Sequence, residues 1–292
     1  MTIAFIGLGN MGAPMAANLV KAGYVVHGFD LDETALNAAA EVGVRAESSA
    51  GAAVAGADLV ITMLPAGRHV LACYAEILPV ARPGTLFADC STVDVADARA
   101  AAEMALAAGH RAMDAPVSGG VVGASAATLT FMAGANAADF AEAEPVLSAM
   151  GRRVVHCGDP GAGQAAKICN NMILGASMIA VSEAFVLGER LGLTHQALFD
   201  VASAASGQCW ALTTNCPVPG PVPASPANHD YRPGFAGALM AKDLGLAASA
   251  VHAHGVSAEL GLHAAQIYAA FAEGEGAGQD FSAIVNTIRE RS

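Results

Sequence analysis

The stretch FIGLGNMGAPMAANL, residues 5–19, places three glycines between a short apolar run and an alanine-rich run. Gly7, Gly9 and Gly12 have the spacing G-x-G-x-x-G. In that pattern the first glycine turns the chain, the second lets a pyrophosphate approach the backbone, and the third packs a helix on a strand. The N–H groups that open the helix attract the anion. The stretch predicts a dinucleotide site formed by Gly7, Leu8, Gly9, Asn10, Met11 and Gly12. The alternative is a glycine turn in an α/β domain without a ligand.

The first half of the chain alternates short β-rich runs with alanine-rich stretches. Strands are predicted at 2–6, 24–29, 58–64 and 84–90, with helices at 15–23, 32–42 and 94–109 between them. Further strands are expected near 111–116, 128–134 and 152–158. This alternation is typical of parallel βαβ units in a doubly wound sheet.

The second half has a different texture. Residues 164–191 contain no proline and are rich in helix formers, which predicts a helix of about 40 Å. Helices are also expected at 193–206, 236–255 and 258–274, with no further strand. The predicted fold class is α/β, with a Rossmann-like doubly wound sheet at 1–162 and an all-α substrate and oligomerisation domain at 163–292, joined by the long interdomain helix.

Composition excludes several classes of function. The 292 residues carry a formal net charge of −12 and contain no basic cluster, so nucleic acid and anionic membranes are not expected as partners. The six cysteines lack metal-ligand spacing and are predicted to be reduced thiols, with no metal site. The most helix-like apolar run, 172–181, is too short to span a bilayer. We therefore expect a cytoplasmic protein outside the membrane.

Three later segments extend the predicted cofactor site. Asp30 ends the second predicted strand, 23 residues after Gly7, where a carboxylate accepts hydrogen bonds from an adenosine ribose. No arginine follows it before Arg45 to attract a 2′-phosphate, so NAD is favoured over NADP. Leu64 and Pro65 lie at the end of the third predicted strand and could line the cofactor, and Thr92 lies at the end of the fourth and could hydrogen-bond it. On position alone, these three could equally be ordinary turn residues.

Two further segments carry candidate chemistry. DAPVSGG, residues 114–120, places a hydroxyl before two glycines, which could form a carboxylate cradle or simply a glycine turn. Lys167 is one of three lysines, and Asn171 follows four residues later on the same helical face. Burial would depress the pKa of a lysine and suit it to proton transfer. A surface lysine with its stem over apolar neighbours is the alternative.

These segments together resemble the β-hydroxyacid dehydrogenase family. FIGLGNMGAPMAANL is similar to its N-terminal signature, and CSTVD, DAPVSGG, GAGQAAKICNN, MAKDLGLA and GQDFSAIV are similar to its later motifs, in order along the whole chain. Residues 206–235 look like the branch that oxidises 3-hydroxyisobutyrate to methylmalonate semialdehyde in valine catabolism. The resemblance implies Lys167 as the general acid/base, Asn171 as a substrate-positioning residue, Ser118, Gly119 and Gly120 as the carboxylate site, and Lys242 near the nicotinamide with Asp243 beside it.

The resemblance also implies NAD as the cofactor, a small hydroxyacid as the substrate and a homo-oligomer, either a dimer or a tetramer. A related reductase of tartronate or succinic semialdehyde is an alternative within the same family. A 6-phosphogluconate dehydrogenase would need a cluster of cations for the sugar phosphate, and the chain has three lysines. A non-catalytic dinucleotide-binding regulator is the alternative from another class, and an intact Lys167 and Asn171 argue against it.

Overall fold

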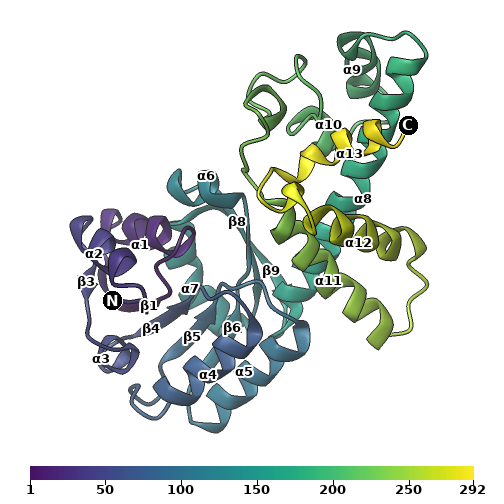
Figure 1. Ribbon diagram of the computed structural model, residues 1–292. Helices are drawn as coiled ribbons and strands as arrows, with labels where there is room; N and C mark the ends of the chain where they lie inside the picture. Colours follow the sequence, from purple (N-terminus) through teal and green to yellow (C-terminus); the bar gives the residue numbers. More distant parts are fainter. The chain divides into compact units, whose positions relative to one another are not determined.

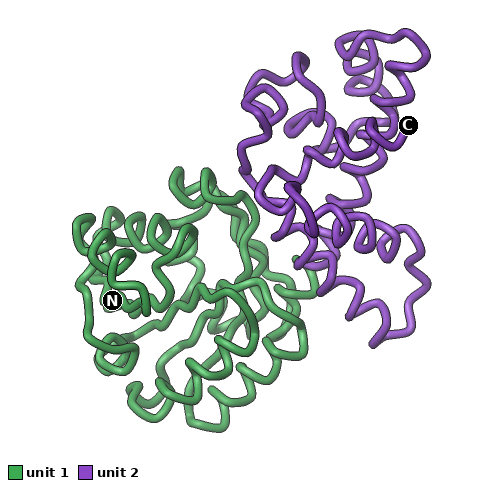
Figure 2. The backbone as a smooth tube through the Cα atoms, viewed as in Figure 1, with its two compact units in different colours: residues 1–167 green, residues 168–292 purple.

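The structure is a computed structural model that describes residues 1–292. The chain forms two compact units, residues 1–167 and 168–292 (Figure 2). The longest helix, α8 (Ala162–Arg190), contains the division between them. The predicted domain boundary at residue 162 coincides with the start of this helix and stays a prediction.

The first unit is built on a nine-stranded sheet (Figure 1). The strand order is β3-β2-β1-β4-β5-β6-β8-β7, with β9 also paired to β8. Strands β1 to β6 are parallel, whereas β8 runs antiparallel to β6 and β7 and parallel to β9. The strands are β1 (Thr2–Ile6), β2 (Val25–Phe29), β3 (Arg45–Ala46), β4 (Leu59–Thr62), β5 (Leu86–Asp89), β6 (Arg111–Asp114), β7 (Val117–Ser118), β8 (Leu129–Gly134) and β9 (Gly151–Gly158).

Alternate side chains of these strands enter two separate cores. Ile3 and Phe5 of β1 pack on one face of the sheet, and Ala4 and Ile6 pack on the other. This period of two is the geometry of a strand buried on both sides. The first face is covered by α1 (Gly12–Lys21), α2 (Glu33–Glu41), α6 (Gly120–Ser125) and α7 (Ala137–Ser148), and the second by α3 (Ala50–Val54), α4 (Gly67–Ile77) and α5 (Val95–Ala107). The predicted doubly wound arrangement is confirmed.

The second unit is helical, as predicted. Its elements after α8 are α9 (His195–Ala204), α10 (Trp210–Thr213), η1 (Pro226–Asn228), α11 (Gly237–Ala253), α12 (Glu259–Ala272), η2 (Glu275–Ala277), η3 (Phe281–Ala283) and α13 (Ile284–Glu290). Asp280, in the C-terminal motif GQDFSAIV, is buried and accepts hydrogen bonds from the backbone of Gly234, Phe235 and Ser282. Its carboxylate therefore fixes the loop that leads into α11.

Helix α8 is long enough to cross a membrane, and its composition would allow it. Its best 18-residue stretch has a mean hydropathy of 1.5, so the short run at 172–181 underestimated its apolar length. Half of that stretch is buried inside the protein. Core helices of globular proteins have the same length and composition, so the finding is weak evidence for a membrane span.

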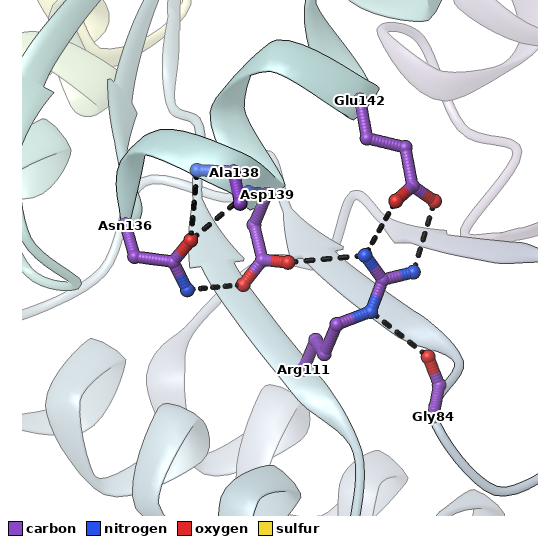
Figure 3. Close-up of polar contacts among 6 residues, drawn as sticks. All are labelled: Gly84, Arg111, Asn136, Ala138, Asp139 and Glu142. Carbon is purple, nitrogen blue, oxygen red and sulfur yellow. Dashed lines mark hydrogen bonds and ion pairs between the residues drawn. The ribbon is translucent and has the colours of Figure 1, made fainter.

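An arginine ties β6 to α7 at the amino edge of the parallel strands (Figure 3). Arg111 donates two hydrogen bonds to the Glu142 carboxylate, one to Asp139 Oδ1 at 3.1 Å and one to the carbonyl of Gly84 at 2.9 Å. Asn136 caps α7 by accepting from the backbone N–H groups of Ala138 and Asp139. Asp139 is buried, so the guanidinium compensates a carboxylate with little access to water.

Replacing Arg111 by methionine should lower the free energy of unfolding by about 1–2 kcal/mol at neutral pH, because Asp139 loses its cation. The hydrogen bond from Arg111 holds the pKa of Glu142 below its ordinary value of 4.5. A carboxyl with a lowered pKa in the folded state stabilises the fold above that value, and the stabilisation is lost as the pH falls. Urea denaturation at several pH values should therefore show the difference between wild type and Arg111→Met narrowing below pH 4.5. A constant difference would contradict this account.

Candidate active site

The carboxyl ends of four parallel strands gather the predicted cofactor segments of the first unit. The loops after β1, β4, β5 and β6 leave the sheet at the same edge, because these strands are parallel neighbours in the order β1-β4-β5-β6. The chain order reverses between β1 and β4, since β2 pairs with the other side of β1. Ligands of open α/β sheets bind at such a reversal.

The glycine loop after β1 fits a dinucleotide. Gly7 has a φ of +96°, and a Cβ there would lie 2.3 Å from the carbonyl oxygen of Met63. A Cβ on Gly12 would lie 1.8 Å from the carbonyl oxygen of Gly7, whereas one on Gly9 would meet no atom within 4 Å. Helix α1 begins with no side-chain cap and no acidic residue in its first turn. Two glycines are thus required by packing, and the middle one leaves room beside helix N–H groups that suit an anion.

Asp30 follows β2 beside this loop. Its carboxylate accepts hydrogen bonds from the backbone N–H of Leu8 at 2.5 Å and of Asp32 at 2.9 Å. A carboxylate has about four acceptor positions, so capacity remains for ribose hydroxyls. Asp30 therefore also orders the glycine loop, a role that the motif spacing did not reveal. Its role in selecting the cofactor stays a prediction.

A hydrogen-bond chain links the loops after β4 and β5. The N–H of Leu64 donates to Ser91 Oγ at 2.8 Å, and this hydroxyl donates to Asp89 Oδ1 at 2.6 Å. Thr62 Oγ1 donates to the same carboxylate oxygen at 2.7 Å. Asp89 and Ser91 were not predicted from the sequence, although Ser91 lies within the segment CSTVD and Asp89 directly before it. Among the predicted residues, Pro65 is exposed, and Leu64 and Thr92 are half-buried.

The loop after β6 holds the predicted carboxylate cradle. Ser118 pairs with Thr130 in the sheet, and Gly119 and Gly120 have φ angles of +135° and +61°. These left-handed conformations favour glycine, so the backbone turn alone explains both glycines. The side chain of Asn18 in α1 donates to the carbonyl of Ala124 at 2.6 Å. That bond holds α6, which begins at Gly120, against the helix of the glycine loop.

Lys167 is buried against the same loop. Its side chain is 6% exposed, and Nζ donates a hydrogen bond to the carbonyl oxygen of Val117 at 2.8 Å. Burying an ammonium group is costly unless polar partners surround it. The structure therefore places an amine beside Ser118, the first residue of the predicted cradle, and the alternative of a surface lysine does not hold.

Asp114 fixes the helix that carries this lysine. Its buried carboxylate accepts hydrogen bonds from the backbone N–H of Gly161 at 2.6 Å and of Gln164 at 2.7 Å, at the first turn of α8. Burial raises the pKa of Asp114 to about 6, although both backbone hydrogen bonds oppose the shift. Asp114 lies in the segment DAPVSGG, but no role was predicted for it from the sequence.

The remaining predicted residues lie in the second unit. Asn171 is buried, and its Nδ2 donates to Asp243 Oδ2 at 2.6 Å. The side chain of Asn170 donates to Asn171 Oδ1 at 2.9 Å. Lys242 is half-buried, with Nζ 3.7 Å from Asp243 Oδ1. Asp243 thus interacts with Asn171 on α8 and with Lys242 on α11, and the roles of both residues stay predictions.

The first unit has a surface hollow of about 470 Å³ at the edge of the sheet opposite to the glycine loop. It is lined by the segment Arg82–Thr85 and by Asp58, Arg111 and Glu142, at the amino edge of the strands. Its charges are already joined in the ion pairs Arg82–Asp58 and Arg111–Glu142. Convergent polar groups and the glycine loop are at the carboxyl edge, so we place the candidate site there. No group of three or more potential metal ligands is present in the chain.

The raised pKa of Asp114, at the start of α8, predicts how the stability of the protein depends on pH. The pKa of Asp114 is about 6 in the folded protein and 3.8 ordinarily. The folded state therefore keeps this proton to higher pH than the unfolded state, and stability falls as the pH rises between these values. We expect the free energy of unfolding of wild type relative to Asp114→Asn to fall by about 1–3 kcal/mol across that range and then level off. Thermal or urea denaturation of both proteins measures this difference, and a difference that rises with pH would contradict the assignment.

Both halves of the chain match known protein families. Residues 2–158 match the NAD-binding domain of 6-phosphogluconate dehydrogenase, and residues 161–288 match the "NAD-binding of NADP-dependent 3-hydroxyisobutyrate dehydrogenase" family. The solved structure of Mycobacterium tuberculosis 3-hydroxyisobutyrate dehydrogenase with L-serine is similar at a TM-score of 0.96 and 59% identity, covering 99% of each chain. The two matched families are both nicotinamide dinucleotide-binding, which agrees with the glycine loop.

Two relatives from Pseudomonas aeruginosa are named for different substrates. The chain is 47% identical to a 3-hydroxyisobutyrate dehydrogenase over 98% of both proteins. It is 46% identical to an NAD-dependent L-serine dehydrogenase over 97% of this chain and 96% of that protein. Identity alone therefore does not separate the two substrates. Full-length similarity, the glycine loop and the buried lysine together show that the chain belongs to the NAD-binding 3-hydroxyisobutyrate dehydrogenase family of oxidoreductases.

Proposed function

We propose that this enzyme oxidises 3-hydroxyisobutyrate to methylmalonate semialdehyde with NAD, a step of valine catabolism, in the cytoplasm and as a homo-oligomer. The observation that carries the proposal is Lys167, a buried amine hydrogen-bonded at 2.8 Å to the backbone one residue before Ser118. The site thus has a proton carrier next to a group that can bind a carboxylate. A small β-hydroxyacid offers a hydroxyl and a carboxylate, one for each of these two groups.

The roles of the residues follow from what each can donate or accept. NAD, when bound, supplies the hydride acceptor. Lys167 accepts the proton of the substrate hydroxyl as general base. A neutral amine has two N–H donors and one lone pair, so Lys167 can keep its bond to Val117 while it accepts that proton. Ser118 with the backbone of Gly119 and Gly120 binds the carboxylate, and Asn171, held by Asp243, orients the hydroxyl.

L-Serine is the second candidate substrate, because a relative named for it is as similar as one named for 3-hydroxyisobutyrate. The two molecules share a primary hydroxyl and a carboxylate and differ at one substituent of the α-carbon. That substituent is a methyl group in 3-hydroxyisobutyrate and an ammonium group in L-serine. A methyl group prefers an apolar wall, whereas an ammonium group needs an acceptor or an anion in the pocket.

A substrate panel tests the proposal. The value of kcat/KM should be measured for both enantiomers of 3-hydroxyisobutyrate, for L-serine and, in the reductive direction, for methylmalonate, tartronate and succinic semialdehydes. We expect one enantiomer of 3-hydroxyisobutyrate to exceed L-serine by at least about tenfold, the discrimination worth roughly 1.4 kcal/mol that a single pocket contact can provide. A higher kcat/KM for L-serine would reject the proposed substrate, and so would a reductive kcat/KM for tartronate or succinic semialdehyde above that for methylmalonate semialdehyde.

The cofactor preference is predicted to depend on Asp30. Asp30 directly follows β2, and its carboxylate would repel the 2′-phosphate of NADP. Wild type should therefore prefer NAD, and Asp30→Ala should narrow the ratio of kcat/KM for NAD to that for NADP. Glu33→Ala removes an exposed carboxylate three residues later and serves as the control, with an unchanged ratio expected. Equal use of both cofactors by wild type would show that Asp30 does not select between them.

The role of Lys167 is predicted to be proton transfer. Lys167→Ala should lower kcat by about 10²–10⁴ and leave NAD binding intact, because the glycine loop and Asp30 are untouched. Lys167→Arg should lose nearly as much, since a guanidinium keeps its proton near neutral pH. Lys21→Arg, at an exposed position on α1, is the matched control and should keep wild-type kcat. Retention of most activity by Lys167→Arg would instead make the residue an electrostatic anchor for the carboxylate.

A further inference from the structure

Gln164 is a completely buried amide in the first turn of α8. Its Nε2 donates to the carbonyl oxygen of Ser91 at 2.6 Å, and its Oε1 accepts from the backbone N–H of Val93 at 3.2 Å. Both polar atoms of the side chain therefore form hydrogen bonds to the loop after β5, at the residues on either side of Thr92. An amide that donates and accepts in this way fixes the loop's position and also its orientation.

The backbone of Gln164 is itself fixed. Its N–H donates to Asp114 Oδ2 at 2.7 Å, and Lys167 follows three residues later on the same helix. Residues at this spacing lie on one face of a helix. One turn of α8 thus holds the Thr92 loop through Gln164 and the Ser118 loop through the bond from Lys167 to Val117.

We propose that Gln164 is a positioning residue, which fixes the position of the predicted cofactor contact Thr92 relative to the catalytic Lys167. This assignment rests on the proposed function, and it adds to the proposed mechanism a residue that touches neither cofactor nor substrate. Hydride transfer is sensitive to the relative placement of cofactor and substrate, because a misplacement of about 1 Å can lower the rate roughly 10²-fold. The adenosine end of NAD is held by other residues, those of the glycine loop and Asp30. Loss of Gln164 should therefore affect the rate more than the binding of NAD.

Two variants isolate the amide. Gln164→Met keeps the length of the side chain and removes both hydrogen bonds. Gln164→Glu keeps an acceptor for the N–H of Val93 and replaces the donor to Ser91 by an oxygen. Thr85→Val is the matched control, because Thr85 is buried and its hydroxyl contacts the carbonyls of Ala57 and Arg82 at the start of β5, the end opposite to Ser91. It removes buried hydrogen bonds from the same sheet without touching the Thr92 loop.

The first measurement uses the protein without added NAD. Hydrogen–deuterium exchange of the peptide that contains Val93 should be at least about tenfold faster in Gln164→Met than in wild type, since that N–H loses its acceptor. Thr85→Val should leave exchange of this peptide unchanged. Unchanged exchange in Gln164→Met would overturn the proposal, because the loop would then be held by other contacts.

The second measurement separates positioning from stability. At a temperature where all variants are folded, kcat should fall by about 10–100-fold in both Gln164 variants. The dissociation constant of NADH, followed by its fluorescence, should change by less than about threefold, in keeping with the separate contacts of the adenosine end. Substrate deuterated at the carbinol carbon should show a larger isotope effect on kcat in the variants, because hydride transfer becomes slower relative to product release.

Three outcomes would overturn the proposal. They are a kcat within twofold of wild type in Gln164→Met, an equal kinetic loss in Thr85→Val, and a loss of NADH affinity that accounts for the loss of rate. All rates are compared with wild type on whichever hydroxyacid of the panel wild type oxidises best. If that substrate is L-serine, the proposed substrate is wrong while the role of Gln164 is still tested.

Discussion

The rest of the candidate site in the first unit depends on the hydrogen bonds between the Asp114 carboxylate and the start of α8. Asp114 ends β6 and accepts from the backbone N–H of Gly161, just before the helix, and of Gln164 in its first turn. With the helix fixed there, Gln164 reaches the loop after β5 and Lys167 reaches the loop after β6. One capped helix start therefore relates three segments that lie far apart in the sequence.

This arrangement constrains the residues around the carboxylate. A Cβ on Gly134 would lie 2.3 Å from Asp114 Oδ1, and one on Gly163 would lie 2.8 Å from Oδ2. Helix and strand can approach the carboxylate closely only because both positions are glycine. The raised pKa of Asp114 shows that the contact has an energetic cost, because burial outweighs the hydrogen bonds that favour the charged form. Functional sites often retain such costly buried charges.

Local patterns in the sequence predicted much of the fold. The glycine spacing at 7–12 and the alternation of apolar and alanine-rich runs depend on neighbouring residues, and they gave the doubly wound sheet and the helical second half. The two-residue strands β3 and β7 were not predicted, because they exist through pairing with β2 and β8 and have no pattern of their own. The predicted helix at 164–191 nearly matches α8 (Ala162–Arg190). Only its apolar length was underestimated, because its polar residues Gln164, Lys167 and Asn171 are buried within it.

The positions of the candidate chemical groups were harder to predict. Lys167 stood out because lysine is rare in this chain, but its partner Val117 is 50 residues away. Gln164 contacts Ser91 across 73 residues, and Asp114 contacts Gly161 across 47. Such pairs depend on strand order and register, which a single sequence does not specify. Asp89 and Ser91 were missed for the same reason, although they adjoin the predicted Thr92.

In the proposed mechanism, Lys167 takes the hydroxyl proton of a β-hydroxyacid whose carboxylate is bound by the Ser118 loop. A crystal structure of the enzyme with NAD and 3-hydroxyisobutyrate tests it most directly. The account predicts the substrate hydroxyl within about 2.6–3.2 Å of Lys167 Nζ, as proton transfer requires, with the carboxylate on Ser118 and the backbone of Gly119 and Gly120. A substrate bound with its carboxylate on Lys167 and its hydroxyl directed elsewhere would contradict it.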